Sequence, residues 1–193
     1  MPTLAPALTG TIIAAGPTLV GPTWFKVASA VAQGVSMWLL TGPAATGMVG
    51  SSNGSLGGGT VNGKLFVVPV VPTMVGAFAA NGMVGPTAAK LASAVTMGLA
   101  NNINATGTYK GVALGVGAGA DITKVSYANV ATLVPILVGT FASKGMVGPS
   151  AVRMATAIAV GTCAVLMTGT GTGAVAGPTG PAPGTGVSTC SIL

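Results

Sequence analysis

The stretch GPTAAKLASAVTMG at residues 85–98 decides how the whole chain is read, because close versions of it stand at two other places. The first is GPTWFKVASAVAQG at residues 21–34, and the third is GPSAVRMATAIAVG at residues 148–161. Each version opens with Gly-Pro followed by Thr or Ser, carries one cation at the same position and ends in glycine. Recurrence at a nearly constant spacing indicates one structural unit used three times.

Each block is predicted to begin a helix. The fixed φ of proline suits a first helical turn, and the hydroxyl that follows can cap exposed N–H groups. Apolar residues at four-residue spacing extend the first helix from residue 23 to about 40. The third runs from residue 150 to about 167, whereas the apolar run of the second ends near Ala100, before Asn101-Asn102.

Small residues thin one face of each predicted helix, so that another helix can approach closely. These helix-packing candidates are Ala28, Ala30, Gly34, Ala92, Ala94, Gly98, Ala155, Ala157 and Gly161.

A second helix is predicted ahead of each block. VPTMVGAFA at 71–79 and VPILVGTFA at 134–142 stand at the same distance before Gly-Met-Val-Gly-Pro, and PALTG at 6–10 is a weaker version. Proline in the first turn, an apolar run, a glycine turn and a second helix describe a helical hairpin. The predicted repeat units are residues 1–65 (divergent), 66–127 and 128–193, stacked in a row or closed into a pseudo-threefold ring.

The segments between the hairpins read as Gly/Thr-rich loops and short strands. Residues 42–63 are predicted to be a long loop, and short strands are expected at 60–69, 108–114 and 122–127. The Gly/Pro/Thr tail from residue 168 is expected to be extended and ordered only by docking on a neighbour. The predicted fold is therefore mainly α with short β-ribbons.

The composition favours a permanently assembled protein. Charged residues are 4% of the chain, against roughly 25% in globular domains, and the mean hydropathy is +0.82. Seven cations stand against one acid, Asp121, but they are scattered singly, which disfavours nucleic-acid binding. The expected partners are other copies of the chain and other proteins of the same assembly, with no small-molecule substrate.

The sequence holds almost nothing with which to build a catalytic site, a cofactor site or a metal site. There is no histidine and no glutamate. The glycines at 115–119 lack the helix and the acid of a dinucleotide fingerprint, and Ser93 near Lys90 belongs to the repeated block. Cys163 and Cys190 have no metal-site spacing and read as a buried thiol and a loosely held one. We expect a protein that is not an enzyme.

The repeated cation is the most informative polar feature. Lys26, Lys90 and Arg153 fall in the first turn of their helices, where the helix dipole disfavours positive charge. Two interpretations stay open: an assembly contact with an acidic neighbour or with carbonyl oxygens at another helix end, or a side chain whose stem covers apolar surface.

A small multi-span membrane protein, such as a phage lysis pore, is the main alternative. The longest apolar windows, 27–40 and 154–167, fall short of the roughly 20 residues that a spanning helix needs. The expected Gly loops and ribbons also suit assembly better than lipid.

The motif GMVGP at 82–86 running into KLASAV at 90–95, with GTVNGKL at 59–65, resembles small structural (virion) proteins of tailed bacteriophages, in particular contractile-tailed marine phages. The resemblance implies a non-enzymatic virion protein of the tail, baseplate, neck or capsid surface. A self-assembling filament subunit differs from this mainly in location.

Overall fold

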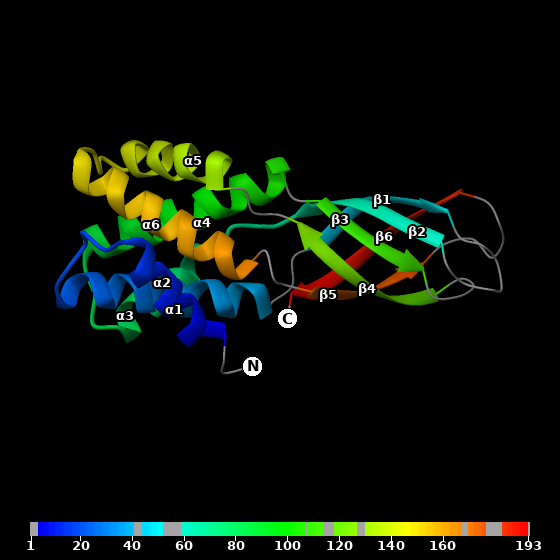
Figure 1. The fold of residues 1–193 in the computed structure, drawn as a ribbon, viewed down its shortest axis with the longest axis horizontal. Helices are drawn as coiled ribbons and strands as arrows, with labels where there is room; N and C mark the ends of the chain where they lie inside the picture. The colour runs from blue at the N-terminus through cyan, green and yellow to red at the C-terminus, as the bar shows by residue number, and fades with distance from the viewer. Residues whose placement is uncertain are drawn as a thin grey trace. The chain divides into compact units, whose positions relative to one another are not determined.

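A computed structural model describes residues 4–40, 44–51, 59–106, 108–113, 118–126, 130–166, 170–176 and 183–192, with side chains for 4–38, 67–106 and 130–165. In these residues two helices and two strands follow one another, and this order occurs three times along the chain (Figure 1). The helices are α1 (Leu4–Ala15), α2 (Pro22–Leu40), α3 (Val71–Ala80), α4 (Pro86–Thr106), α5 (Val130–Ser143) and α6 (Pro149–Leu166). The strands are β1 (Ala44–Ser51), β2 (Gly59–Phe66), β3 (Thr108–Ala113), β4 (Ala118–Ser126), β5 (Thr170–Ala176) and β6 (Pro183–Ile192). The prediction of a mainly helical chain is confirmed.

The chain divides into two compact units that cut across the predicted repeat boundaries. The helical unit is Met1–Trp38, Pro69–Asn102 and Ala128–Leu166, and the strand unit is Leu39–Val68, Ile103–Tyr127 and Met167–Leu193. Residues 1–65, 66–127 and 128–193 therefore each contribute to both units.

The strands form one closed barrel in the order β1-β2-β3-β4-β5-β6, every neighbouring pair antiparallel. β6 closes it on β1, with Ala44 opposite Thr189 and Ser51 opposite Pro183. The expectation of separate short ribbons is wrong, because the backbone groups at each strand edge bond to the next hairpin along the chain.

Two segments predicted to lack regular structure contain strands. β1 lies inside the predicted loop 42–63, and β5 and β6 lie in the tail that was expected to need a neighbouring molecule. The tail's partners are β4 and β1 of the same chain.

The helix that each block was predicted to open begins at the proline of that block, one residue before the predicted starts at 23 and 150. The carbonyl oxygen of the glycine before it accepts a hydrogen bond from the residue four positions later: Phe25, Ala89 and Val152 donate to Gly21, Gly85 and Gly148 at 3.4, 3.1 and 3.2 Å. Those three glycines have φ of 101°, 101° and 103°, a region that favours glycine. Three turns of the same local geometry therefore start α2, α4 and α6.

α4 continues past Asn101, where its apolar run ends, to Thr106, because Asn102 donates to the Thr132 hydroxyl at 3.0 Å and Asn104 bonds to the backbone of Val67. One helix start differs from the prediction. α5 begins at Val130, so that Pro135 stands inside the helix and not in its first turn.

The core of the helical unit is built from first-helix side chains and the thin faces of the second helices. Leu8, Met74 and Leu137 are buried at corresponding positions of α1, α3 and α5, counted back from the glycine that follows each helix. One turn later the buried residues are Ile12, Phe78 and Phe141. Most of the largest fully buried side chains thus come from the first helix of each pair.

Candidate assembly surface

The nine small residues singled out in the repeated blocks are all buried in the helical unit. The alanines among them have relative exposures of 1% or less. Small side chains at buried positions let neighbouring helix backbones approach closely.

The three block glycines mark where second helices meet the next first helices. A Cβ on Gly34 of α2 would collide with the Met74 side chain of α3, and one on Gly98 of α4 would lie 2.5 Å from Leu137 Cδ2 of α5. A Cβ on Gly161 of α6 would lie 2.5 Å from Ile12 Cα of α1. The last helix of the unit therefore packs on the first.

A hydrogen bond reinforces this last contact. The Thr11 hydroxyl of α1 donates to the Gly161 carbonyl oxygen at 3.0 Å, across 150 residues of sequence. At the corresponding place on α5, Thr140 Oγ1 lies 3.0 Å from the Cβ position of Gly98. At two of the three interfaces, α1 with α6 and α5 with α4, a threonine hydroxyl of the first helix thus lies against the block glycine of the second helix.

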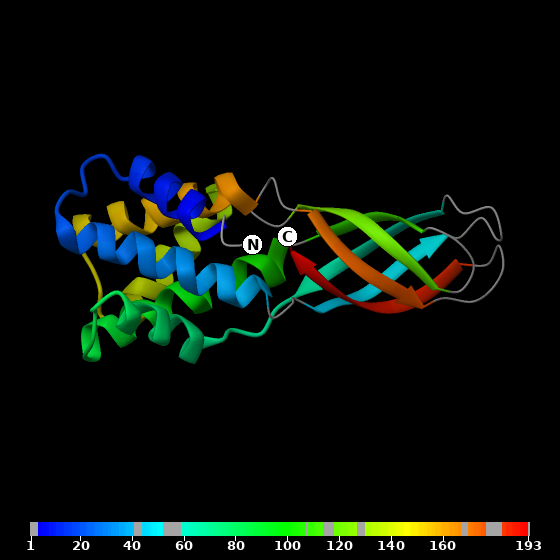
Figure 2. The same ribbon diagram turned by 90° about the horizontal axis from the view of Figure 1, so that it is seen from below.

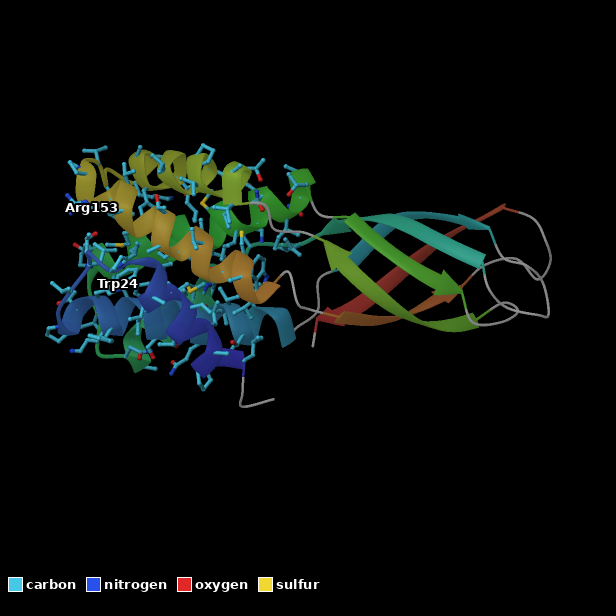
Figure 3. All side chains as sticks on the ribbon, in the orientation of Figure 1. Trp24 and Arg153 are labelled. Carbon is cyan, nitrogen blue, oxygen red and sulfur yellow. The ribbon has the colours of Figure 1, made fainter. Side chains whose placement is uncertain are left out.

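The three repeated cations are exposed near the N-terminal ends of α2, α4 and α6, beside the turns that join α1 to α2, α3 to α4 and α5 to α6. These turns lie together at one end of the helical unit (Figure 2), and Figure 3 shows Arg153 there. The ammonium of Lys26 lies 3.7 Å from the Cβ position of Gly82, just past the end of α3. Positive charge near a helix C-terminus is favourable. Lys26 thus lies beside the C-terminal end of α3 within the same chain, and its assembly contact stays a prediction.

Three exposed valines accompany the cations, and the sequence analysis missed them. Val20, Val84 and Val147 are 83%, 79% and 76% exposed, and each directly precedes the Gly-Pro of its block. Their identical place before the block was the available signal. It was overlooked because the Gly-containing segments were interpreted only as turns.

In the described part of the chain, the side chains considered for catalysis or metal binding do not lie together in a reactive arrangement. The Ser93 hydroxyl lies 3.8 Å from Met97 Sδ, while Lys90 is exposed. No cluster of three metal-ligating side chains occurs among the described residues. Cys163 is a buried free thiol, and burial raises its pKa to about 11. Cys190 lies on β6, outside the described side chains.

Within the described residues, no helix combines the length and apolar character that crossing a bilayer requires. No protein-family model, curated protein or solved structure matches the chain.

Proposed function

We propose that this protein is a non-enzymatic structural subunit of a large assembly, a bacteriophage virion, and that its three helical hairpins form a pseudo-threefold ring within one chain. The observation that carries the proposal is the packing of α6 on α1 at Gly161 and Ile12. Together with the contacts of α2 on α3 and of α4 on α5, it supports a cyclic order of the hairpins.

A cyclic arrangement supports a structural role because one chain then presents the same surface residues at three equivalent places. Each exposed position of the block occurs three times around one axis, as a closed homotrimer would present it. A single polypeptide of this kind can meet a threefold site of a particle, or three neighbouring copies of one partner. The charge-poor composition agrees with a surface that is mostly subunit contact.

The direct test is mass spectrometry of purified particles, with copy number measured against a capsid protein of known stoichiometry. The proposal expects the chain to sediment with intact particles and to stay there after a high-salt wash. A chain that fractionates with membranes and resists carbonate extraction would instead be a membrane protein. A filament subunit would sediment as fibres without other virion proteins.

Replacing the repeated cations tests the assembly contact directly. Because Lys26, Lys90 and Arg153 are exposed, the triple alanine variant should change the free energy of unfolding by only about 0.5 kcal/mol or less. Incorporation into particles should fall clearly below that of the unmodified chain. Unchanged incorporation would leave these cations with only a local role on the helix surface.

A further inference from the structure

We propose that the turn end of the helical unit docks on an acidic surface of a different protein, one that presents carboxylates around apolar depressions. This turn face consists of Val20, Val84, Val147, Lys26, Lys90 and Arg153. The inference rests on the structural role proposed above and deepens it by naming the partner's chemistry.

The charge of the turn face is entirely of one sign. The helical unit carries four cations, and all four lie at this end: the three of the turn face and Lys144 in the α5–α6 turn. The N-termini of α2, α4 and α6 point to the same end and add partial positive charge. A protein that neutralises this face has to supply carboxylates.

A second copy of the chain cannot supply them. The chain has one acidic side chain, Asp121, and it lies on β4 in the strand unit. Pairing two turn faces would set their six cations, and the two copies of Lys144 beside them, against one another with no acid between them, which is repulsive. The face therefore selects a chain of different composition.

The valines give the contact its apolar part. Each stands next to a glycine of positive φ that leads into a hydrogen-bonded helix start, so the valines are held on ordered backbone before any partner arrives. Preorganised side chains lose little conformational freedom on binding. Phe25 and Val152, 53% and 45% exposed, extend the apolar surface along α2 and α6.

A protein surface fits this pattern better than a lipid surface. Membrane-surface segments bury Trp, Phe and Leu, whereas the three tips here are valines, and Phe25 is the only exposed residue of those types among the described side chains. Three valines at matched positions suit a partner with discrete depressions at a matching spacing, and a bilayer has no such spacing. An anionic membrane is accordingly the competing outcome of the test.

The experiment is zero-length carbodiimide cross-linking of the full-length chain in its native assembly, followed by peptide mass spectrometry. The expected products join Lys26, Lys90 or Lys144 to Asp or Glu residues of another, identified protein. The variant Val20→Ser, Val84→Ser, Val147→Ser should lose these products several-fold. The control Met37→Ser, Met97→Ser, Val160→Ser removes three other exposed apolar side chains of α2, α4 and α6 and should keep them.

Three cross-linking results would overturn the inference: products mainly with Asp121 of a second copy, no products at these lysines, or equal yields in the valine and control variants. Valine-dependent sedimentation with phosphatidylserine-containing vesicles would overturn it as well. The structural role is judged separately. A chain that sediments with particles but lacks these cross-links keeps that role and loses this docking face. A chain absent from particles that still gives the cross-links loses the virion assignment only.

Discussion

Glycines in the helices of this protein have two opposite environments. Gly34, Gly98 and Gly161 lie where another helix occupies the space of a Cβ. Gly10, Gly76 and Gly139, at corresponding positions of α1, α3 and α5, have no atom within 4 Å of a Cβ position apart from their chain neighbours and the nearby backbone of their own helix. The same residue type is therefore required by packing in one helix of each pair and not in the other.

Alanine at the block glycines should destabilise the protein in a defined order. Gly161→Ala drives its methyl into backbone atoms of Ile12, at 2.5 and 2.6 Å, so the helices must separate. A loss of about 1–3 kcal/mol in the free energy of unfolding is expected. Gly98→Ala and Gly34→Ala meet mainly the Leu137 and Met74 side chains, which can rotate, and should cost less. Urea denaturation measures the series.

The matched controls are Gly10→Ala, Gly76→Ala and Gly139→Ala. With open space at the Cβ, the gain in helix propensity should leave each variant unchanged or more stable by about 0.5–1 kcal/mol. If Gly161→Ala behaved like these controls, α6 and α1 would not be in close contact in solution.

The thiol of Cys163 should be chemically silent in the folded protein. Apolar burial disfavours the thiolate and raises its pKa to about 11. In a Cys190→Ser background, iodoacetamide at a pH of about 8 should modify Cys163 far more slowly in native buffer than in urea. Equal rates in the two conditions would contradict its burial.

The same pKa shift gives a stability effect of known sign. The unfolded thiol releases its proton near its ordinary pKa, about 8.5, whereas the folded thiol holds it up to about 11. Stability from the neutral thiol is therefore complete at neutral pH and is lost as the pH rises through this window. The free energy of unfolding of the protein should therefore fall relative to that of the Cys163→Ala variant as the pH rises from about 8 to about 11.

At the scale of elements, Asn104 near the end of α4 should be a strong local stabiliser. Its side chain accepts a hydrogen bond from Val67 N at 2.8 Å and donates one to Val67 O at 3.1 Å. Val67 is buried, so Asn104→Ala leaves two backbone groups without this partner. A loss of about 1–3 kcal/mol is expected in thermal or urea unfolding.

Asn101→Ala is the matched control, because Asn101 is an exposed asparagine of the same helix. It should change the free energy of unfolding by about 0.5 kcal/mol or less. Equal effects of the two substitutions would mean that the bonds to Val67 contribute nothing measurable.

The predictable elements were those whose signals are local. Gly-Pro at residues 21, 85 and 148 placed three helix starts, because proline geometry acts within one turn. The end of α4 has no local signal, because the asparagines at 102 and 104 bond to distant partners. Strands β1, β5 and β6 were missed since Gly/Ser/Thr sequences lack the β-branched alternation that marks strands, while the barrel bonds their backbone whatever the side chain.

The surface residues also divide into those with a signal in the sequence and those without one. Lys26, Lys90 and Arg153 were found because a charge stands out in a charge-poor chain. Val20 and its counterparts were not, because an apolar residue in an apolar sequence gives no contrast until its exposure is known. Burial is a tertiary property, and the repeat alone does not report it.

At the scale of the whole molecule, the sequence left stacking and ring closure equally open. A row and a ring use the same blocks and differ only in whether α6 meets α1. That contact joins residues about 150 positions apart, and its determinants, Thr11, Ile12 and Gly161, look ordinary in sequence.

Circular permutation tests the cyclic order, since a ring has no privileged starting unit. Joining Leu193 to Met1 leaves four residues between β6 and α1, the same number that separates β2 from α3. A permutant that starts at Pro69 and ends at Val68 should therefore fold with no added linker. Its helix content by circular dichroism and its sedimentation should match those of the parent, with a thermal midpoint lower by only a few degrees.

The control permutant opens the chain between Met97 and Gly98, inside α4 where Gly98 packs on Leu137. This cut removes helical hydrogen bonds and divides a core-forming face, so the control permutant should unfold at a much lower temperature than the first permutant. If the three units were stacked in a row, the Pro69 permutant should not fold normally without a linker. There the junction would tether the two ends of an open array, and folding would require strain or exchange between molecules. Monomeric, cooperative unfolding of the Pro69 permutant thus distinguishes a ring, in which α1 and α6 are neighbours, from a row.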